Sequence, residues 1–214
     1  VNFDDANIEC SSADNINNNA TTIVGASSQN KKRYYMMLVS SFGLFAIVCG
    51  YMAAIQPVGW TFFSWHPFLM TCGMIGMFGP AIQTKKLGGY VNTKVHGILA
   101  MAGCCMALGG VYIIYENKRR LERRHLQTLH SILGAAVLIG IFLVGIAGSA
   151  FLHPDFGMDR SNKMIRFLHS WSARSFVFLA WIVAWLGLYE LKQNIFILAA
   201  YAVPLIILTP LTLL

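Results

Sequence analysis

The sequence predicts an all-α membrane protein with six transmembrane helices. Of its 214 residues, 56% are hydrophobic and only 12% are charged, and the mean hydropathy is +0.57. This composition is far more apolar than that of an average soluble domain. The apolar residues gather in six runs, each long enough to cross a bilayer as a helix of about 20 residues. None of these runs alternates with the two-residue period of a membrane β-strand, which favours helices.

The first 30 residues are predicted to form a disordered tail. They are rich in Asn, Ser, Thr, Ala and Asp, show no apolar periodicity, and contain four acidic residues but no Lys or Arg. The chain begins at Val1 without a charged segment followed by a short apolar stretch, so a cleavable signal peptide is not evident. The rest of the chain holds all sixteen Lys and Arg residues and five acidic residues, so it carries +11 of formal charge against −4 in the tail. We expect the bilayer, and no nucleic acid, to be its surroundings.

Residues 34–214 are predicted to be the membrane domain. The six apolar runs cover residues 34–56, 62–83, 93–115, 126–150, 165–189 and 195–214. The connections between them are short, so consecutive helices should be antiparallel. The last run ends without a polar tail, which suggests that the chain is truncated there.

The basic residues in the short loops predict that the N-terminus lies in the cytosol. With this orientation, nine Lys and Arg residues lie on the inner side and six on the outer side. The basic cluster 118–124 is the exception, because it falls on the outer side and supplies five of those six residues.

Four histidines lie about one turn inside four consecutive runs. Because neighbouring helices are antiparallel, His66 and His130 should share one depth near the outer face, and His96 and His169 one depth near the inner face. Two imidazoles at the same depth on two helices are the minimum for binding a haem iron from both sides. Helices 2–5 are therefore predicted to form a four-helix bundle around two b-type haems. The cysteines form no CxxC or CxxCH motif, so covalent haem and a disulfide framework are not expected.

The motifs around these histidines resemble the cytochrome b561 family. They read FSWHPFLM at 63–70, KVHG at 94–97, HLQTLH at 125–130 with a following Gly134, and FLHS at 167–170. The resemblance covers about residues 34–200 and is strongest to the domain-containing-protein branch. It implies two non-covalent haem b groups, with His66 and His130 ligating the non-cytoplasmic haem and His96 and His169 the cytoplasmic one.

The resemblance also implies an activity. Family members take electrons from cytosolic ascorbate and pass them across the membrane to monodehydroascorbate or to ferric iron. The chain would then be a transmembrane ascorbate ferrireductase or monodehydroascorbate reductase. An endomembrane or vesicle membrane is expected rather than the plasma membrane, and whether the protein forms a homodimer stays open.

Three basic side chains outside the histidine pairs are candidates for contacts with substrates. Lys94, two residues before His96, is placed to bind an anion such as ascorbate, although positive-inside topology alone also places lysines there. At the outer face, Arg124 and His125 could hold an anionic acceptor such as a ferric chelate, or His125 could pass protons. The alternative for both is a solvated connection between two helices.

Arg174 is the one strongly charged residue well inside an apolar run, and members of the family usually have a small residue at this position. One interpretation is a side chain that reaches back to the inner headgroups. The other is a salt bridge to a propionate of the inner haem, which would raise the reduction potential of that haem.

Two other functions stay open on the sequence alone. A histidine-lined proton or metal-ion transporter without haem would also place histidines in membrane helices. Such transporters usually carry acidic residues or broken helices at mid-membrane, whereas the apolar runs here hold no Asp or Glu away from their ends. A haem-free structural subunit is the third alternative.

Overall fold

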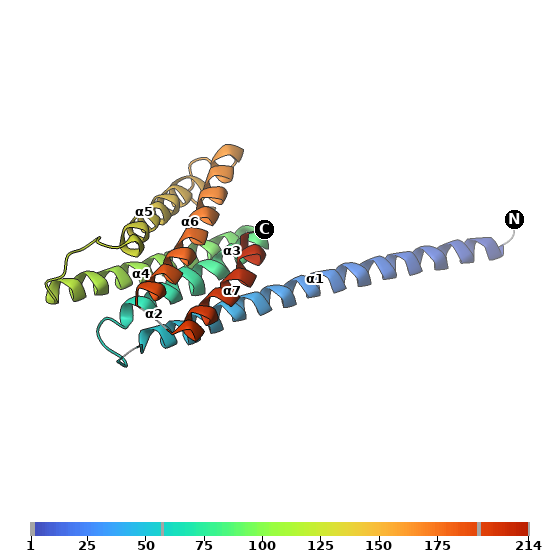
Figure 1. The fold of residues 1–214 in the computed structure, drawn as a ribbon. Coiled ribbons are helices and arrows are strands. Elements are labelled where there is room, and N and C mark those ends of the chain that lie inside the picture. Colours follow the sequence, from blue (N-terminus) through green and yellow to red (C-terminus); the bar gives the residue numbers. More distant parts are fainter. Residues whose placement is uncertain (1–2, 57, 192–193, 214) are drawn as a thin grey trace. The chain divides into compact units, whose positions relative to one another are not determined.

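The computed structural model describes residues 3–56, 58–191 and 194–213, and every regular element in this part of the chain is helical (Figure 1). The elements in chain order are α1 (Phe3–Ala54), α2 (Trp65–Thr71), the π-helix η1 (Cys72–Met77), α3 (Phe78–Lys86), α4 (Tyr90–Arg120), α5 (Leu129–Leu152), α6 (Lys163–Glu190) and α7 (Ile195–Leu213). The chain divides into two units, Val1–Leu38 and Val39–Leu214, and the second contains all the candidate site residues.

Within the described residues, four helices are long and apolar enough to cross a membrane. They are residues 29–54 of α1 and the helices α4, α5 and α6. The prediction of an all-helical membrane protein is confirmed. The predicted run 62–83 corresponds to α2, η1 and α3, which follow one another without a gap, and the predicted run 195–214 corresponds to α7. The first of these runs is divided among three elements, whereas the second is one helix of 19 residues. The described residues thus contain four clear candidate spans, and the count of six stays a prediction.

Helix α1 begins at Phe3 and so includes most of the segment predicted to be a disordered tail. Isolated helices owe most of their stability in proteins to a packed apolar face, and the composition of residues 3–28 supplies no apolar stripe. The disordered tail and its boundary near residue 30 stay predictions.

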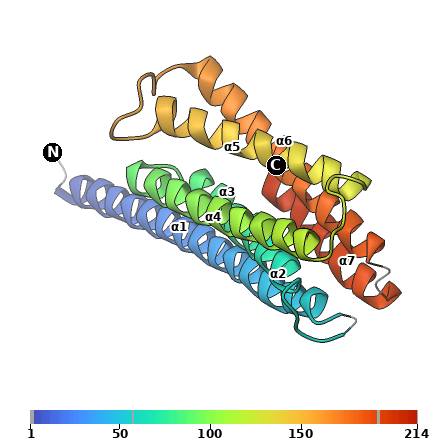
Figure 2. The same cartoon turned by 90° about the vertical axis from the view of Figure 1, so that its left-hand side faces the viewer.

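The helices around the candidate site pack in two antiparallel sets. Helices α2, η1 and α3 lie against α4, and α5 lies against α6 (Figures 1 and 2). Local signals determine where three of these helices begin. Gly88 and Gly89 have φ of 72° and 83°, which suits glycine, and form the turn into α4. Thr128 forms a capping box at the start of α5, and the Asn162 side chain caps α6.

A π-helix interrupts the second predicted run. Most of its residues are buried, including Gly73, whose position in contact with α4 leaves no room for a Cβ because one would lie 2.9 Å from the Gly103 carbonyl oxygen. The Met74 carbonyl in η1 accepts a hydrogen bond from Nε1 of Trp181 at 3.1 Å. Trp181 lies on α6 and is only 2% exposed. The π-helix is therefore held between α4 and α6, in the interior of the bundle.

Candidate functional site

His66 and His130 face each other across the bundle. Their ring centroids are 6.3 Å apart and their planes are inclined by 84°. Each Nδ1 lies at hydrogen-bond distance from a backbone carbonyl of another helix, 2.9 Å from Gly110 for His66 and 2.8 Å from Val183 for His130. Because a carbonyl can only accept, Nδ1 of each ring carries the proton. Nε2 is then left with its lone pair, as a neutral imidazole needs for metal binding.

His96 and His169 form a second pair with nearly the same geometry. Their centroids are 6.4 Å apart and their planes are inclined by 83°. Nδ1 of His96 donates to the Ala81 carbonyl at 2.9 Å, which again leaves Nε2 available. Nδ1 of His169 is buried and has no hydrogen-bond partner among the described residues. The structure thus brings together the two pairs that antiparallel topology predicts.

The carbonyls that hold these rings lie at equivalent places on their helices. Gly110 follows His96 by fourteen residues, and Val183 follows His169 by fourteen residues. Ala81 follows the histidine of its own run by fifteen residues. The π-helix lies between them and accounts for the extra residue, since a π-bulge inserts one residue into an α-helix.

Two glycines allow the rings to lie directly against the opposite helix. A Cβ on Gly187 would come within 2.7 Å of Cε1 of His130, and a Cβ on Gly148 within 2.5 Å of Cε1 of His169. Both distances are below any real carbon contact, so any side chain at these positions would have to displace a ring. Gly134, which follows the HLQTLH motif, is less restricted, because a Cβ there would meet only an ordinary contact at 3.4 Å.

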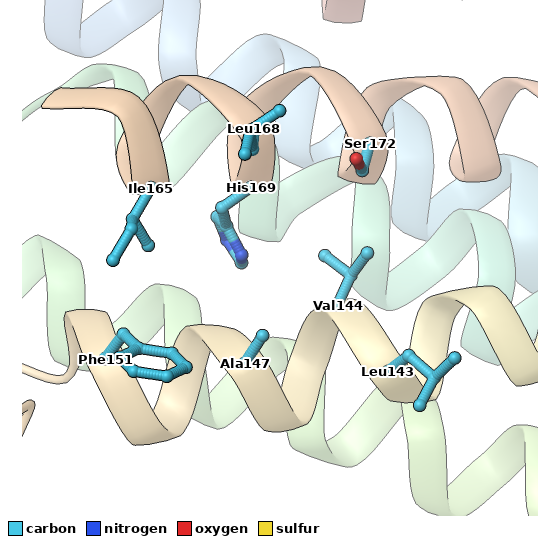
Figure 3. A pocket seen from close by; sticks show the side chains of 8 residues that line it. All are labelled: Leu143, Val144, Ala147, Phe151, Ile165, Leu168, His169 and Ser172. Atoms are coloured by element: carbon cyan, nitrogen blue, oxygen red, sulfur yellow. The ribbon is translucent and has the colours of Figure 1, made fainter.

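An apolar cavity of about 440 Å³ borders the ring of His169. Its walls come from α5 and α6, and Figure 3 shows the His169 ring pointing from α6 into the space beside Ala147 and Val144 of α5. Phe151 and Leu143 belong to the same wall. The cavity is therefore suited to a flat apolar group in contact with the imidazole.

The distances between the paired rings fit two imidazoles on opposite sides of one metal ion. An imidazole nitrogen binds a first-row metal at about 2 Å, which places the centroids of two trans ligands roughly 6 Å apart. No group of three or more His, Cys, Asp or Glu side chains that could hold a metal occurs in the described part of the chain. Two protein ligands are too few for a structural zinc site. They suffice for haem, whose macrocycle supplies the other donors to the iron.

Lys94 lies at the beginning of α4, on the side of the His96 and His169 pair. Its Nζ is 2.8 Å from Oδ2 of Asp155 and 2.9 Å from the Tyr90 hydroxyl, and that hydroxyl donates to Oδ1 of Asp155. The hydrogen bonds from Lys94 and then Tyr90 lower the pKa of Asp155 below its usual value. The ion pair is therefore present at neutral pH and is lost on acidification, as the carboxyl group is protonated below the usual range of an aspartate. Sequence reasoning did not single out Asp155 or Tyr90.

His125 and Arg124 lie in the connection between α4 and α5. The ring of His125 stacks on Tyr115, with centroids 4.9 Å apart and planes inclined by 17°. Glu122 and Leu126 on either side have φ of 51° and 52°, a region that L side chains rarely adopt. Such a backbone costs about 1–3 kcal/mol per residue and is found most often at functional sites. The stacking with Tyr115 was missed, because aromatic belts already explain a tyrosine at a membrane interface.

Part of the basic cluster 118–124 is neutralised within α4. Glu116 is 2.7 Å from Nε of Arg119 and 2.8 Å from Nε of Arg120. The Arg120 guanidinium also lies over the Phe62 ring, 4.4 Å from its centroid. The cluster therefore has fewer free charges than the sequence suggests, and the side chains of Arg123 and Arg124 are the exposed cations that remain beside His125.

Arg174 lies on α6, five residues beyond His169, and is half-buried. Its guanidinium makes no ion pair or hydrogen bond within the described residues.

Comparison with known proteins places the four histidines inside a matched family region. A family model described as eukaryotic cytochrome b561 matches residues 65–196, the segment that holds all four paired histidines. The chain is 29% identical to the transmembrane reductase CYB561D2 of Mus musculus over 116 residues, which are 49% of this chain and 50% of the relative. It is 26% identical to the transmembrane reductase CYB561D2 of Bos taurus over 115 residues, again 49% and 50% of the two chains. The chain spans about half the length of the curated relatives it matches.

Proposed function

Because the chain belongs to the eukaryotic cytochrome b561 family, we propose that it transfers electrons across a membrane with two non-covalent haem b groups. The observation that carries the proposal is the facing of the histidine rings at 6.3 Å and 6.4 Å. His66 and His130 would hold one iron, and His96 and His169 the other. When bound, haem supplies reversible one-electron chemistry, and the protein supplies orientation and electrostatics.

The proposal includes six membrane spans. Residues 65–86 would form one span, since α2, η1 and α3 are continuous and about 33 Å long at 1.5 Å per residue. Helix α7 would form the last span. The second to fifth spans then make the four-helix bundle that contains both histidine pairs. Nine basic residues against six support a cytosolic N-terminus, and we place the protein in an endomembrane or vesicle membrane.

The two pairs would lie near opposite faces of the bilayer. Val183, whose carbonyl holds His130, is fourteen residues beyond His169 on α6. This corresponds to about 21 Å along the helix axis, within a hydrocarbon layer about 30 Å thick. Such a separation suits electron transfer from one face to the other without a mobile carrier.

We assign the side of His96 and His169 to the donor, ascorbate, and the opposite side to the acceptor, monodehydroascorbate or a ferric chelate. Lys94, together with Lys85 and Lys86, would attract the ascorbate anion. Arg124 and His125 would bind the acceptor, because the strained connection presents an exposed cation beside a stacked imidazole. Both substrates are anions, and basic side chains at each end of the bundle raise their local concentration.

The absorption spectrum of the purified protein tests this function. We expect ascorbate or dithionite to produce sharp low-spin b-type bands in the α region, with two haems per chain by extraction. A folded protein from haem-replete cells that shows no such bands would contradict the proposal. The alternative would then be the haem-free proton or metal-ion transporter, in which the same histidines bind protons or metal ions directly.

Replacing Arg174 with Gln is expected to lower the midpoint potential of one haem, that held by His96 and His169. Among the described residues the guanidinium has no ion-pair partner, and it would neutralise a propionate, whose negative charge favours the ferric state. We expect a shift on the order of 50 mV, close to the roughly 59 mV that a tenfold change in equilibrium constant represents for one electron. Potentiometric titration measures it. Arg174→Lys keeps the charge and should restore most of the potential, and an unchanged midpoint in Arg174→Gln would exclude the propionate contact.

A further inference from the structure

We propose that Asp155 is a built-in competitor of the anionic electron donor: its carboxylate occupies the Lys94 ammonium, and the donor has to displace it in order to bind. This inference rests on the proposed function, because it takes Lys94 as the residue that binds the donor. It adds to that function a carboxylate that determines which electron donors can bind. An oxyanion can replace the Asp155 carboxylate as the partner of the Lys94 ammonium, whereas a neutral solute cannot.

Asp155 is held on both of its carboxylate oxygens. Oδ2 lies 2.8 Å from Nζ of Lys94, and Oδ1 accepts a hydrogen bond from the Tyr90 hydroxyl. Lys94 closes the arrangement by donating to the Tyr90 oxygen at 2.9 Å. The three side chains come from two places in the chain, the first turns of α4 and the connection between α5 and α6. Asp155 and Tyr90 thus occupy two of the three N–H donors of the ammonium group that an anionic donor would bind.

The connection that carries Asp155 is a folded turn. The backbone N–H of Asp155 donates to Nδ1 of His153 at 3.2 Å, and that of Gly157 donates to the His153 carbonyl at 3.0 Å. The Met158 N–H donates a hydrogen bond to the Ala150 carbonyl near the end of α5, also at 3.0 Å. The turn therefore presents Asp155 to Lys94 with little further loss of conformational entropy, which is what makes a tethered carboxylate an effective competitor.

The pair is also accessible and weak enough to be exchanged. The Lys94 and Asp155 side chains are 41% and 40% exposed, so a solute can approach both. Exposed ion pairs of this kind contribute little to stability, because water screens them. A dissolved oxyanion offers Lys94 and Tyr90 the same acceptor atoms as Asp155 does. A neutral reductant offers neither group a replacement for the lost carboxylate, so the exchange favours anions.

Asp155→Asn tests the proposal, because it removes the charge but keeps the shape of the side chain. The haem-loaded protein in vesicles is assayed for the KM of ascorbate and for the inhibition constant of inorganic phosphate, an anion that undergoes no redox reaction. We expect both constants to fall about two- to fivefold, the range that corresponds to loss of an exposed ion pair. An unchanged haem spectrum shows that the variant is folded.

Asp159→Asn is the matched control. It removes one negative charge from the same connection, but Asp159 accepts its hydrogen bond from Asn162, at 2.8 Å, and does not touch Lys94. Both constants should stay as in the unaltered protein. Equal falls in the two variants would mean a general field effect and would overturn the proposal. A higher KM in Asp155→Asn would mean that Asp155 positions Lys94, and would overturn it as well.

Lys94→Gln separates this inference from the function on which it rests. A raised KM for ascorbate in Lys94→Gln, together with no fall in Asp155→Asn, would overturn the competitor role alone. An unchanged KM in Lys94→Gln would remove Lys94 from the donor site, and the proposed donor site would fail with it. The haem spectrum would be the same in either case.

Discussion

Replacing either His66 or His130 with alanine is expected to remove one haem and to leave the other in place. Replacing His96 or His169 should remove the second haem and leave the first. The reason is that each pair has its own facing rings and its own backbone carbonyls, and no histidine belongs to both pairs. Haem content should fall from two per chain to about one, and the remaining spectrum should be the same for the two members of a pair.

Potentiometric titration of the four variants makes the pairing visible, since each variant should retain a single midpoint potential. His153→Ala serves as the control, because His153 lies in the connection between α5 and α6, where its ring stacks on Phe156. It should retain both haems. If His66 and His96 shared one phenotype, the antiparallel arrangement of the two pairs would be refuted.

Gly148→Ala is expected to impair the site of His96 and His169, and Gly187→Ala the site of His66 and His130. The added Cβ would meet a histidine ring at 2.5 Å and 2.7 Å, respectively. A rigid helix pair can only respond by rotating the ring or moving apart, and overpacking of this kind typically costs about 1–3 kcal/mol. We expect partial loss of one haem in each variant, or high-spin bands from the displaced imidazole, measured by haem content and absorption.

Gly145→Ala is the matched control on the same helix as Gly148, since nothing lies within 4 Å of a Cβ there. Replacing glycine by alanine in an unstrained helix is expected to be neutral or stabilising by about 0.4–1 kcal/mol. Gly145→Ala should therefore keep both haems and an unchanged or higher melting temperature. Equal loss of haem in Gly145→Ala and Gly148→Ala would show that helix flexibility, and not ring contact, is responsible.

The partners of the histidines could be predicted because depth in a membrane can be counted along the chain. Once the direction of successive helices alternates, the position of His66 in its run determines which histidine shares its level. The apolar runs likewise predict where helices form, because an unpaired backbone in lipid is too costly. These inferences depend on spacing within one helix and on the bilayer thickness, both of which the sequence contains.

The close contacts between helices could not be predicted in the same way. Gly148 and Gly187 are two of nineteen glycines, and only the rotation of α5 and α6 about their axes brings them against a ring. The π-helix has the same apolar composition as a regular helix, and the Met74 carbonyl is bonded by Trp181, 107 residues further along the chain. Asp155 is a single acid in a polar connection, and no local pattern distinguishes it from Asp159.

The two histidine pairs are so alike that their geometry alone does not determine the direction of electron transfer. Ring separation and ring inclination are nearly the same at both levels, and the Nδ1 atoms of His66, His130 and His96 each donate to a carbonyl of another helix. Two haem sites of equal geometry would not by themselves favour electron transfer in one direction. Under the proposed function, the direction of electron transfer must then come from features that differ between the two ends: Arg174, which has no ion pair among the described residues, the Lys94–Asp155 ion pair at the same end, and the solutes present on each side.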